Sequence, residues 1–224
     1  MSYTWRDVQA RCWALGEDPG PIDGMNGPRT RDAVRRALRK RDGGTVFDLF
    51  HHSGLHRVHW HWTAGAYGAI ALELRAYNAV VDKDGNVHDG KFRPEAQARY
   101  QVGKAASHTL NANTGAIGIS CDAMAGARER PFEWGSAPLT QAQIDGMIDQ
   151  TALWCVAYDI PATRYSTLSH SEVQKTLGIR QRWKWDINVL PGMDRPGDPI
   201  QIGDRLRAML VERLQDYGVY EVAA

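Results

Sequence analysis

Two histidines separated by one residue, His59 and His61, stand near the end of the apolar segment LHRVHWHWTAG at residues 55–65. Side chains two apart in a β-strand point to the same face, so the two imidazoles should lie together, with the apolar side chains on the opposite face. The small residues of the TAG triplet end the strand and let a substrate or another segment approach closely. A histidine at such a strand end is suited to be the first ligand of a catalytic metal.

Catalytic zinc takes three protein ligands and keeps a fourth position open for water. The best downstream candidates to complete the set are His170, in LSHSEV, and Asp186, in RWKWDIN. Spacing alone does not select this triple, because eight histidines and many aspartates allow others. The alternatives are a core histidine hydrogen-bonded to backbone at His61 and a turn or capping carboxylate at Asp186.

The residue pattern around these side chains predicts strands that alternate with helices. Strands are expected at 55–62, 77–81, 87–90 and 116–121, and helices at 140–158 and about 202–214. Thr140 and Gln143 form a capping box at the start of the first of these helices. Residues 82–86 (DKDGN) are a hairpin turn, and residues 66–76 are ambiguous between helix and loop. We therefore expect an α/β or α+β domain around one core.

The first forty residues form a different kind of unit. Thr4 is expected to cap a first helix that Gly16 closes, and Thr30 precedes a second helix. Between them lies a loop dense in turn formers, DPGPIDGMNGP. The segment DGGT at 42–45 is a flexible linker, and a short helix over 46–52 leads into the first strand of the larger domain. This predicts a boundary that divides 1–44 from 45–224.

Composition places the chain among ordinary globular proteins. Hydrophobic residues make up 43% and charged residues 24%, and the net charge of +1 argues against general attraction to nucleic acid. No stretch reaches the length of a membrane span, and the first residues lack the apolar core of a signal peptide. The three cysteines are too few and too widely spaced for a disulfide framework, so buried reduced thiols are expected. The basic run at 35–41 either complements a helix dipole or binds an anionic polymer.

Residues 8–34, VQARCWALGEDPGPIDGMNGPRTRDAV, resemble the peptidoglycan-binding domain family, a small three-helix module. The shared features are VQ, an LG pair, PGPIDG, GP-T and AV, in the order of the family pattern. The sequence departs from that pattern at Arg36-Ala37-Leu38, where the family often has a Phe-Gln pair. The resemblance implies an N-terminal all-α module that binds the bacterial cell wall, and the departure implies a weakened affinity for glycan.

Residues 55–190 resemble the zinc-dependent N-acetylmuramoyl-L-alanine amidases, a family that includes phage lysins and animal peptidoglycan-recognition proteins. Five motifs occur in the family's order. VHWHWTAG parallels the family's strand ending in HHTAG, and RAYNAVVDKDGNVHDG parallels its tyrosine-led hairpin. SHTLNANTGAIGIS parallels its His, Asn and SIGI sequence, and LSHSEV and KWD follow. The resemblance implies a central mixed sheet flanked by helices. It also implies that the chain is a hydrolase of the bacterial wall.

Matched position by position, the resemblance implies zinc ligation by His61, His170 and Asp186 and catalysis by Tyr77 and Lys184. The ion would activate a water molecule for attack on the amide between the lactyl group of N-acetylmuramic acid and L-alanine, while the Lys184 ammonium would stabilise the oxyanion. Tyr77 would orient the water or the carbonyl. If the segment before Asp186 is extended, Lys184 and Asp186 leave it on the same face.

His108 and Asn113 match family positions near the substrate, and the resemblance implies that they bind it. The sequence also departs from the family. The interval from His170 to Asp186 is longer than in compact members, and Ser120 stands where some members have a glutamate whose role we assign to the tyrosine. His59 is the alternative ligand.

These observations together predict a peptidoglycan amidase, most simply a phage or prophage endolysin. We expect it to be a monomer made in the host cytoplasm without a signal peptide, to act on the wall after release, and to bind neither nucleic acid nor membranes stably. Asp122 is a further acidic residue that could act near the site. The alternatives are an amidase that acts on wall fragments in the cytosol or as an effector, and a recognition protein that binds peptidoglycan without cutting it.

Overall fold

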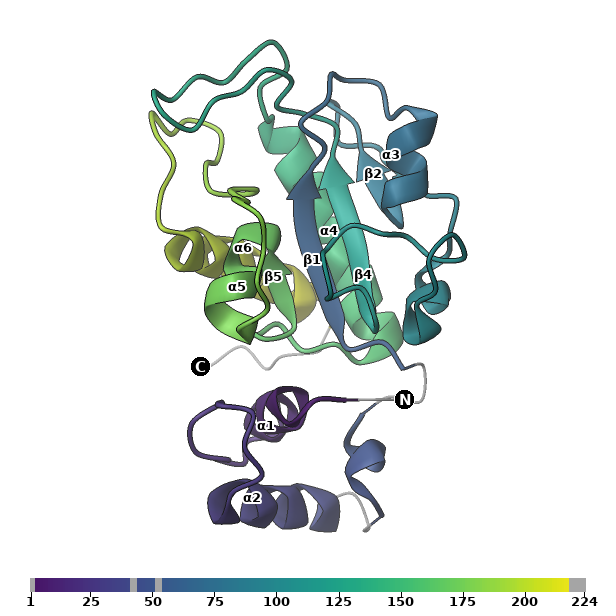
Figure 1. Ribbon diagram of the computed structural model, residues 1–224, viewed down its shortest axis with the longest axis vertical. Helices are drawn as coiled ribbons and strands as arrows, with labels where there is room; N and C mark the ends of the chain where they lie inside the picture. The colour runs from purple at the N-terminus through teal and green to yellow at the C-terminus, as the bar shows by residue number, and fades with distance from the viewer. Residues whose placement is uncertain (1–2, 41–43, 51–53, 218–224) are drawn as a thin grey trace.

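The computed structural model describes residues 3–40, 44–50 and 54–217. Its centre is a five-stranded sheet in the order β3-β2-β4-β1-β5 (Figure 1). The strands are β1 (Arg57–Trp62), β2 (Ala79–Val81), β3 (Val87–Asp89), β4 (Ala116–Cys121) and β5 (Thr167–Ser169). β1 runs parallel to β4 and β5, β2 runs parallel to β4, and β3 pairs with β2 in the antiparallel sense. The predicted mixed sheet and its hairpin are confirmed.

β1 lies between β4 and β5, and all six of its residues are buried. Val58, Trp60 and Trp62 belong to the main apolar core, and the Trp60 indole N–H donates a 3.0 Å hydrogen bond to the Thr151 hydroxyl. His59 and His61 are the alternate residues of the strand, and their rings lie 6.5 Å apart. The period of two therefore separates a packed face from a polar face, as predicted.

Helices cover the sheet, and α4 lies behind β1 and β4 in the view of Figure 1. They are α3 (Ala71–Ala76), the 3₁₀ helix η2 (Pro94–Arg99), α4 (Gln141–Tyr158), α5 (His170–Leu177) and α6 (Pro199–Asp216). The capping box predicted at the start of α4 is present. α6 begins three residues before the predicted start because the Asp198 side chain accepts from the amides of Ile200 and Gln201. The ambiguous segment 66–76 contains α3, while β5 and α5 were not predicted.

The N-terminal segment folds into α1 (Trp5–Ala14), α2 (Pro28–Arg39) and the 3₁₀ helix η1 (Val46–Leu49). Thr4 caps α1 as predicted. α2 starts at Pro28 rather than after Thr30, because proline suits the first position of a helix. These elements share a small apolar cluster made of Val8, Cys12, Ala33, Ala37, Leu49 and Phe50. The packing of this unit therefore reaches beyond residue 44. Part of the expected linker and the end of the helix expected at 46–52 lie outside the described residues.

This N-terminal unit contacts the amino-terminal edge of the sheet, the end opposite to that of His61 (Figure 1). The Arg57 guanidinium forms a buried ion pair with Asp7, and Arg11 pairs with Asp159. Within the basic run, Arg36 and Lys40 both pair with Glu17, at 2.6 and 2.8 Å. These two cations thus act within the fold. The division into two domains at residue 44 stays a prediction.

Two expectations from composition concern the whole chain. All three cysteines are buried and free, as predicted. Across the described ranges, no helix has both the length and the apolar character needed to cross a bilayer.

Candidate metal centre

The three predicted ligands meet at the carboxyl edge of the parallel strands. His61 is the fifth residue of β1, and His170 is the first residue of α5, directly after β5. Because β1 and β5 are parallel neighbours, their carboxyl ends lie at the same edge, where open α/β sheets place their sites. The backbone N–H of Ser171 donates to the Asp186 carbonyl at 2.9 Å, which ties the third residue to the start of α5.

Three ligand atoms from these residues lie within hydrogen-bonding distance of one another. His61 Nδ1 is 3.1 Å from His170 Nδ1 and 3.1 Å from Asp186 Oδ2. His170 Nδ1 is 3.3 Å from the same carboxylate oxygen. Tetrahedral coordination with bonds of about 2.0–2.1 Å separates neighbouring ligand atoms by about 3.3–3.4 Å. The spacing therefore suits a zinc ion after outward shifts of a few tenths of an ångström.

His170 is held by a buried anchor at the start of α5. Ser169 caps the helix, and the Glu172 carboxylate accepts from the Ser169 N–H at 2.8 Å. Arg207 of α6 donates to Glu172 Oε1 and to the carbonyl of Thr167, each at 2.7 Å. A fully paired buried charge of this kind fixes the helix start, and with it the His170 side chain.

Gln181 fixes the proton of His170. Its side-chain nitrogen donates to the backbone carbonyls of Leu110 and Ile179, at 2.9 and 3.3 Å, so its oxygen must face His170. That oxygen lies 3.0 Å from His170 Nε2. Nε2 therefore carries the hydrogen, and Nδ1 presents a lone pair to the cluster.

His108 fixes the proton of His61 in the same way. Its Nε2 lies 3.2 Å from the carbonyl of Ala116, which can only accept, so His108 Nε2 carries a hydrogen and Nδ1 is an acceptor. His61 Nε2 lies 3.2 Å from that acceptor and donates to it. His61 Nδ1 is left without a proton, so both histidines present their unprotonated nitrogens toward Asp186.

Burial and close contacts shift the pKa values of the groups in the cluster. Burial lowers the pKa of the His61 imidazole to about 4, so the ring is neutral at neutral pH. Burial opposes ionisation of Asp186, but His170 and His61 outweigh it and hold the pKa of the carboxyl well below its usual range. Two lone pairs and a carboxylate oxygen face one another with no hydrogen between them, an arrangement that a divalent cation stabilises. The donor set fits zinc.

The two predicted catalytic residues flank the cluster. The half-buried Tyr77 ring lies 5.2 Å from the His61 ring, and burial raises the pKa of its hydroxyl, which therefore stays protonated. Lys184 is exposed and lines an open cavity of about 730 Å³ together with His170. Trp183, directly before Lys184, has a φ of +48°. The extended conformation assumed from Lys184 to Asp186 stays a prediction.

The two residues predicted to bind substrate, His108 and Asn113, also line this cavity, but their polar atoms form hydrogen bonds within the protein. His108 is buried, and both of its nitrogens are engaged as described above. A Cβ at Gly118 would lie 2.5 Å from the His108 ring, so the glycine of the AIGI sequence at 116–119 makes room for it. The Asn113 side-chain oxygen accepts from the amides of His108 and Thr109, at 3.0 and 2.9 Å. Binding of substrate by these residues stays a prediction.

The two other candidates are not brought into the cluster. His59 Nδ1 lies 3.0 Å from the Thr109 hydroxyl, and the ring forms a second group with His61 and His108, away from Asp186. The Asp122 carboxylate accepts from the amides of Gly68 and Ala69 and from the Gln143 side chain. Asp122 thus organises the loop after β1.

Similar structures include the amidase LysC of Clostridium intestinale (16% identity, 72% of this chain and 89% of that chain, TM-score 0.41). They also include the endolysin amidase LysCS of the same organism (17% identity, 71% of this chain and 86% of that chain, TM-score 0.42). A third is the amidase AmiD of E. coli in complex with a substrate (19% identity, 53% of this chain and 49% of that chain, TM-score 0.38). No curated protein matches the chain. The family profile of N-acetylmuramoyl-L-alanine amidases (Amidase_2) matches residues 49–187, more than half of the sequence, and the chain therefore belongs to this family.

Proposed function

We propose that the protein is a zinc-dependent N-acetylmuramoyl-L-alanine amidase, which hydrolyses the amide between N-acetylmuramic acid and the first alanine of the peptidoglycan stem. The convergence of three unprotonated ligand atoms beside an open cavity carries this proposal. A recognition protein that only binds the wall has no need of such an arrangement.

The protein's own residues have distinct roles in this reaction. His61, His170 and Asp186 hold the ion, and His108 and Gln181 keep the two imidazoles in the required tautomer. When bound, zinc polarises the scissile carbonyl and acidifies a water molecule. The Lys184 ammonium, on the cavity wall, stabilises negative charge on the carbonyl oxygen, and the Tyr77 hydroxyl beside His61 orients the reacting groups.

We further propose that the protein works as a phage or prophage endolysin on the cell wall, after release from the cytoplasm and as a monomer. The PGPIDG-type segment lies in a packed helical unit at the edge of the sheet opposite to the metal cluster. A wall-binding module in that position leaves the cavity open to substrate.

Mass analysis of purified peptidoglycan after incubation with the zinc-loaded protein tests the activity. We expect free stem peptides that begin with alanine and glycan strands of unchanged length. Released disaccharides would show a glycosidase instead, and binding to the wall without any product would favour the recognition protein.

A further inference from the structure

A second cavity, of about 650 Å³, adjoins the one beside the metal cluster. Gln181, Arg182 and Lys184 line both cavities, so the segment 180–184 separates them. The second cavity is also lined by Ser171, directly after His170, and by Asn188, two residues after Asp186. A substrate whose scissile bond lies at the metal cluster can therefore extend into both cavities.

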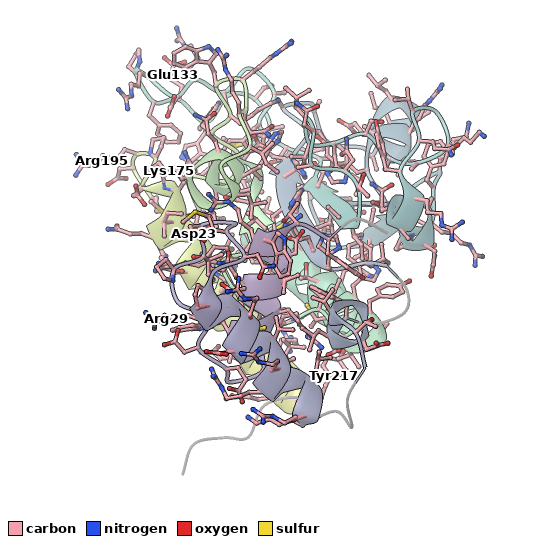
Figure 2. All side chains as sticks on the ribbon, turned by 60° about the horizontal axis from the view of Figure 1, so that its bottom comes forward. Asp23, Arg29, Glu133, Lys175, Arg195 and Tyr217 are labelled. Carbon is pink, nitrogen blue, oxygen red and sulfur yellow. The ribbon has the colours of Figure 1, made fainter. Side chains whose placement is uncertain are left out.

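The two cavities differ in charge. We call the first the neutral cavity, because apart from its shared residues it is lined by uncharged polar and apolar side chains and by the histidines His108 and His170. We call the second the cationic cavity, because its walls carry five cations and two carboxylates; the cations are Arg130, Lys175, Arg180, Arg182 and Lys184. Lys175, labelled in Figure 2, is paired with Asp198 at 2.9 Å. Arg180 and Arg182 make no ion pair with any residue that the structure describes.

The cationic cavity also carries an exposed aromatic side chain. Trp183 is 99% exposed, and its φ of +48° is rare for a bulky residue. Exposure of a whole indole forgoes the free energy that its burial would supply, and residues in such backbone conformations cluster at ligand clamps. Its neighbours in the sequence are Arg182 and Lys184, so one short segment presents a flat apolar indole ring between two cations.

We infer that the cationic cavity binds the stem peptide of the substrate and that the neutral cavity binds the sugar. This inference rests on the proposed amidase activity. A stem peptide carries free carboxylates, which guanidinium groups bind with charge-assisted hydrogen bonds, and alanyl methyl groups, which an indole can cover. The sugar carries only hydroxyl and acetamido groups once its lactyl carboxyl is joined to the peptide. Arg180 and Arg182 are thus specificity residues for an acidic peptide.

Calorimetry with the zinc-loaded protein and two separate probes tests this assignment. The first probe is a free tetrapeptide, L-Ala-γ-D-Glu-L-Lys-D-Ala, and the second is the disaccharide N-acetylglucosaminyl-N-acetylmuramic acid with its lactyl group capped as the N-methylamide. Joint Arg180→Glu and Arg182→Glu changes should weaken binding of the peptide by roughly tenfold or more and leave binding of the disaccharide unchanged. Trp183→Ala should weaken binding of the peptide and leave binding of the disaccharide unchanged.

Three controls isolate the cause. Arg195→Glu reverses an exposed cation, labelled in Figure 2, that lines neither cavity, and should change neither affinity. A peptide with amidated carboxyls should bind weakly and be insensitive to the double charge reversal. Joint Ser107→Ala and Thr114→Ala changes in the neutral cavity should weaken binding of the disaccharide and leave binding of the peptide unchanged.

The assignment is overturned if the wild-type protein does not bind the peptide, if the double reversal leaves peptide affinity unchanged, or if it weakens both probes equally. These outcomes are separate from those of the amidase test. A protein that cleaves the muramoyl amide but fails here keeps the proposed activity and loses the assignment. A protein that cleaves nothing but binds the peptide through Arg180 and Arg182 loses the activity alone.

Discussion

Two groups of buried side chains share His61, and only one of them has the properties of a metal site. In the first, His61, His170 and Asp186 direct unprotonated atoms at one another. In the second, the rings of His108 and His59 lie 5.2 and 6.5 Å from that of His61. Thr109 and a backbone carbonyl engage the nitrogens of His108, and Thr109 lies beside His59 Nδ1, while His59 Nε2 is buried without a hydrogen-bond partner among the described residues. Burial is common to both groups. We propose that the placement of protons selects the first group for a cation.

The largest expected effect separates the groups directly. His61→Ala, His170→Ala and Asp186→Ala each remove one of three ligands, so each should lose stoichiometric zinc and lower amidase activity to that of a metal-free control. Elemental analysis after dialysis, with circular dichroism to check the fold, measures this. Full zinc occupancy in any one of these variants would remove that residue from the ligand set.

The next largest effect is expected at Lys184 and Tyr77, which flank the group of His61, His170 and Asp186 without being proposed metal ligands. Lys184→Ala should retain zinc but lose about 100- to 1000-fold in turnover, because one preorganised donor to the oxyanion is missing. Tyr77→Phe should fall similarly or less. Turnover of a defined muropeptide by the zinc-loaded variants is the measurement. Wild-type rates in both would contradict the catalytic roles while leaving the metal site intact.

A smaller effect is expected where the structure assigns a proton. Gln181→Met removes the acceptor that holds the hydrogen of His170 on Nε2, so zinc affinity should fall by about 10- to 100-fold. Gln181→Glu keeps an acceptor beside His170 Nε2 but loses the two hydrogen bonds donated to Leu110 and Ile179, so it should restore only part of the affinity. Competition with a chromogenic chelator gives both values. Equal losses in the two variants would show that Gln181 acts only through packing.

The smallest effect is expected in the second group. His59→Gln keeps a polar side chain near Thr109 and removes a nitrogen that we assign no metal. Zinc stoichiometry and affinity should be those of the wild type. A clear loss of zinc, with the fold preserved, would mean that the two groups have been distinguished wrongly.

The sequence predicts much of this fold, because β1 and β4 are buried runs of six residues and α4 opens with a capping box. β5 has only three residues and, unlike the equally short β2 and β3, no hairpin turn beside it that identifies it. α5 follows it at once, begins with His170, and is likewise absent from the predicted elements. Local pattern thus misses short elements that only the tertiary fold imposes.

The three candidate ligands could be named from the sequence because each lies in a recognisable motif. The role of Gln181 could not, because its contacts join His170 to the carbonyl of Leu110, far away in the sequence. The expectation that His108 binds substrate rests on its match to a family position, and its burial over Gly118 emerges only from the packing of the loop on β4. Trp183 shows the same limit, because nothing in the local sequence indicates its φ of +48°.

The central claim is that His61 and His170 hold zinc through Nδ1, each with its proton on Nε2. Two-dimensional ¹⁵N NMR of the histidine rings, recorded on the zinc-free and zinc-loaded protein, tests it most directly. We predict that both rings are neutral Nε2–H tautomers in both states, that only their Nδ1 resonances shift strongly with zinc, and that His59 does not shift as a ligand does. A proton on Nδ1 of either ring in the zinc-loaded protein, or a ligand-type shift at His59, would contradict the account.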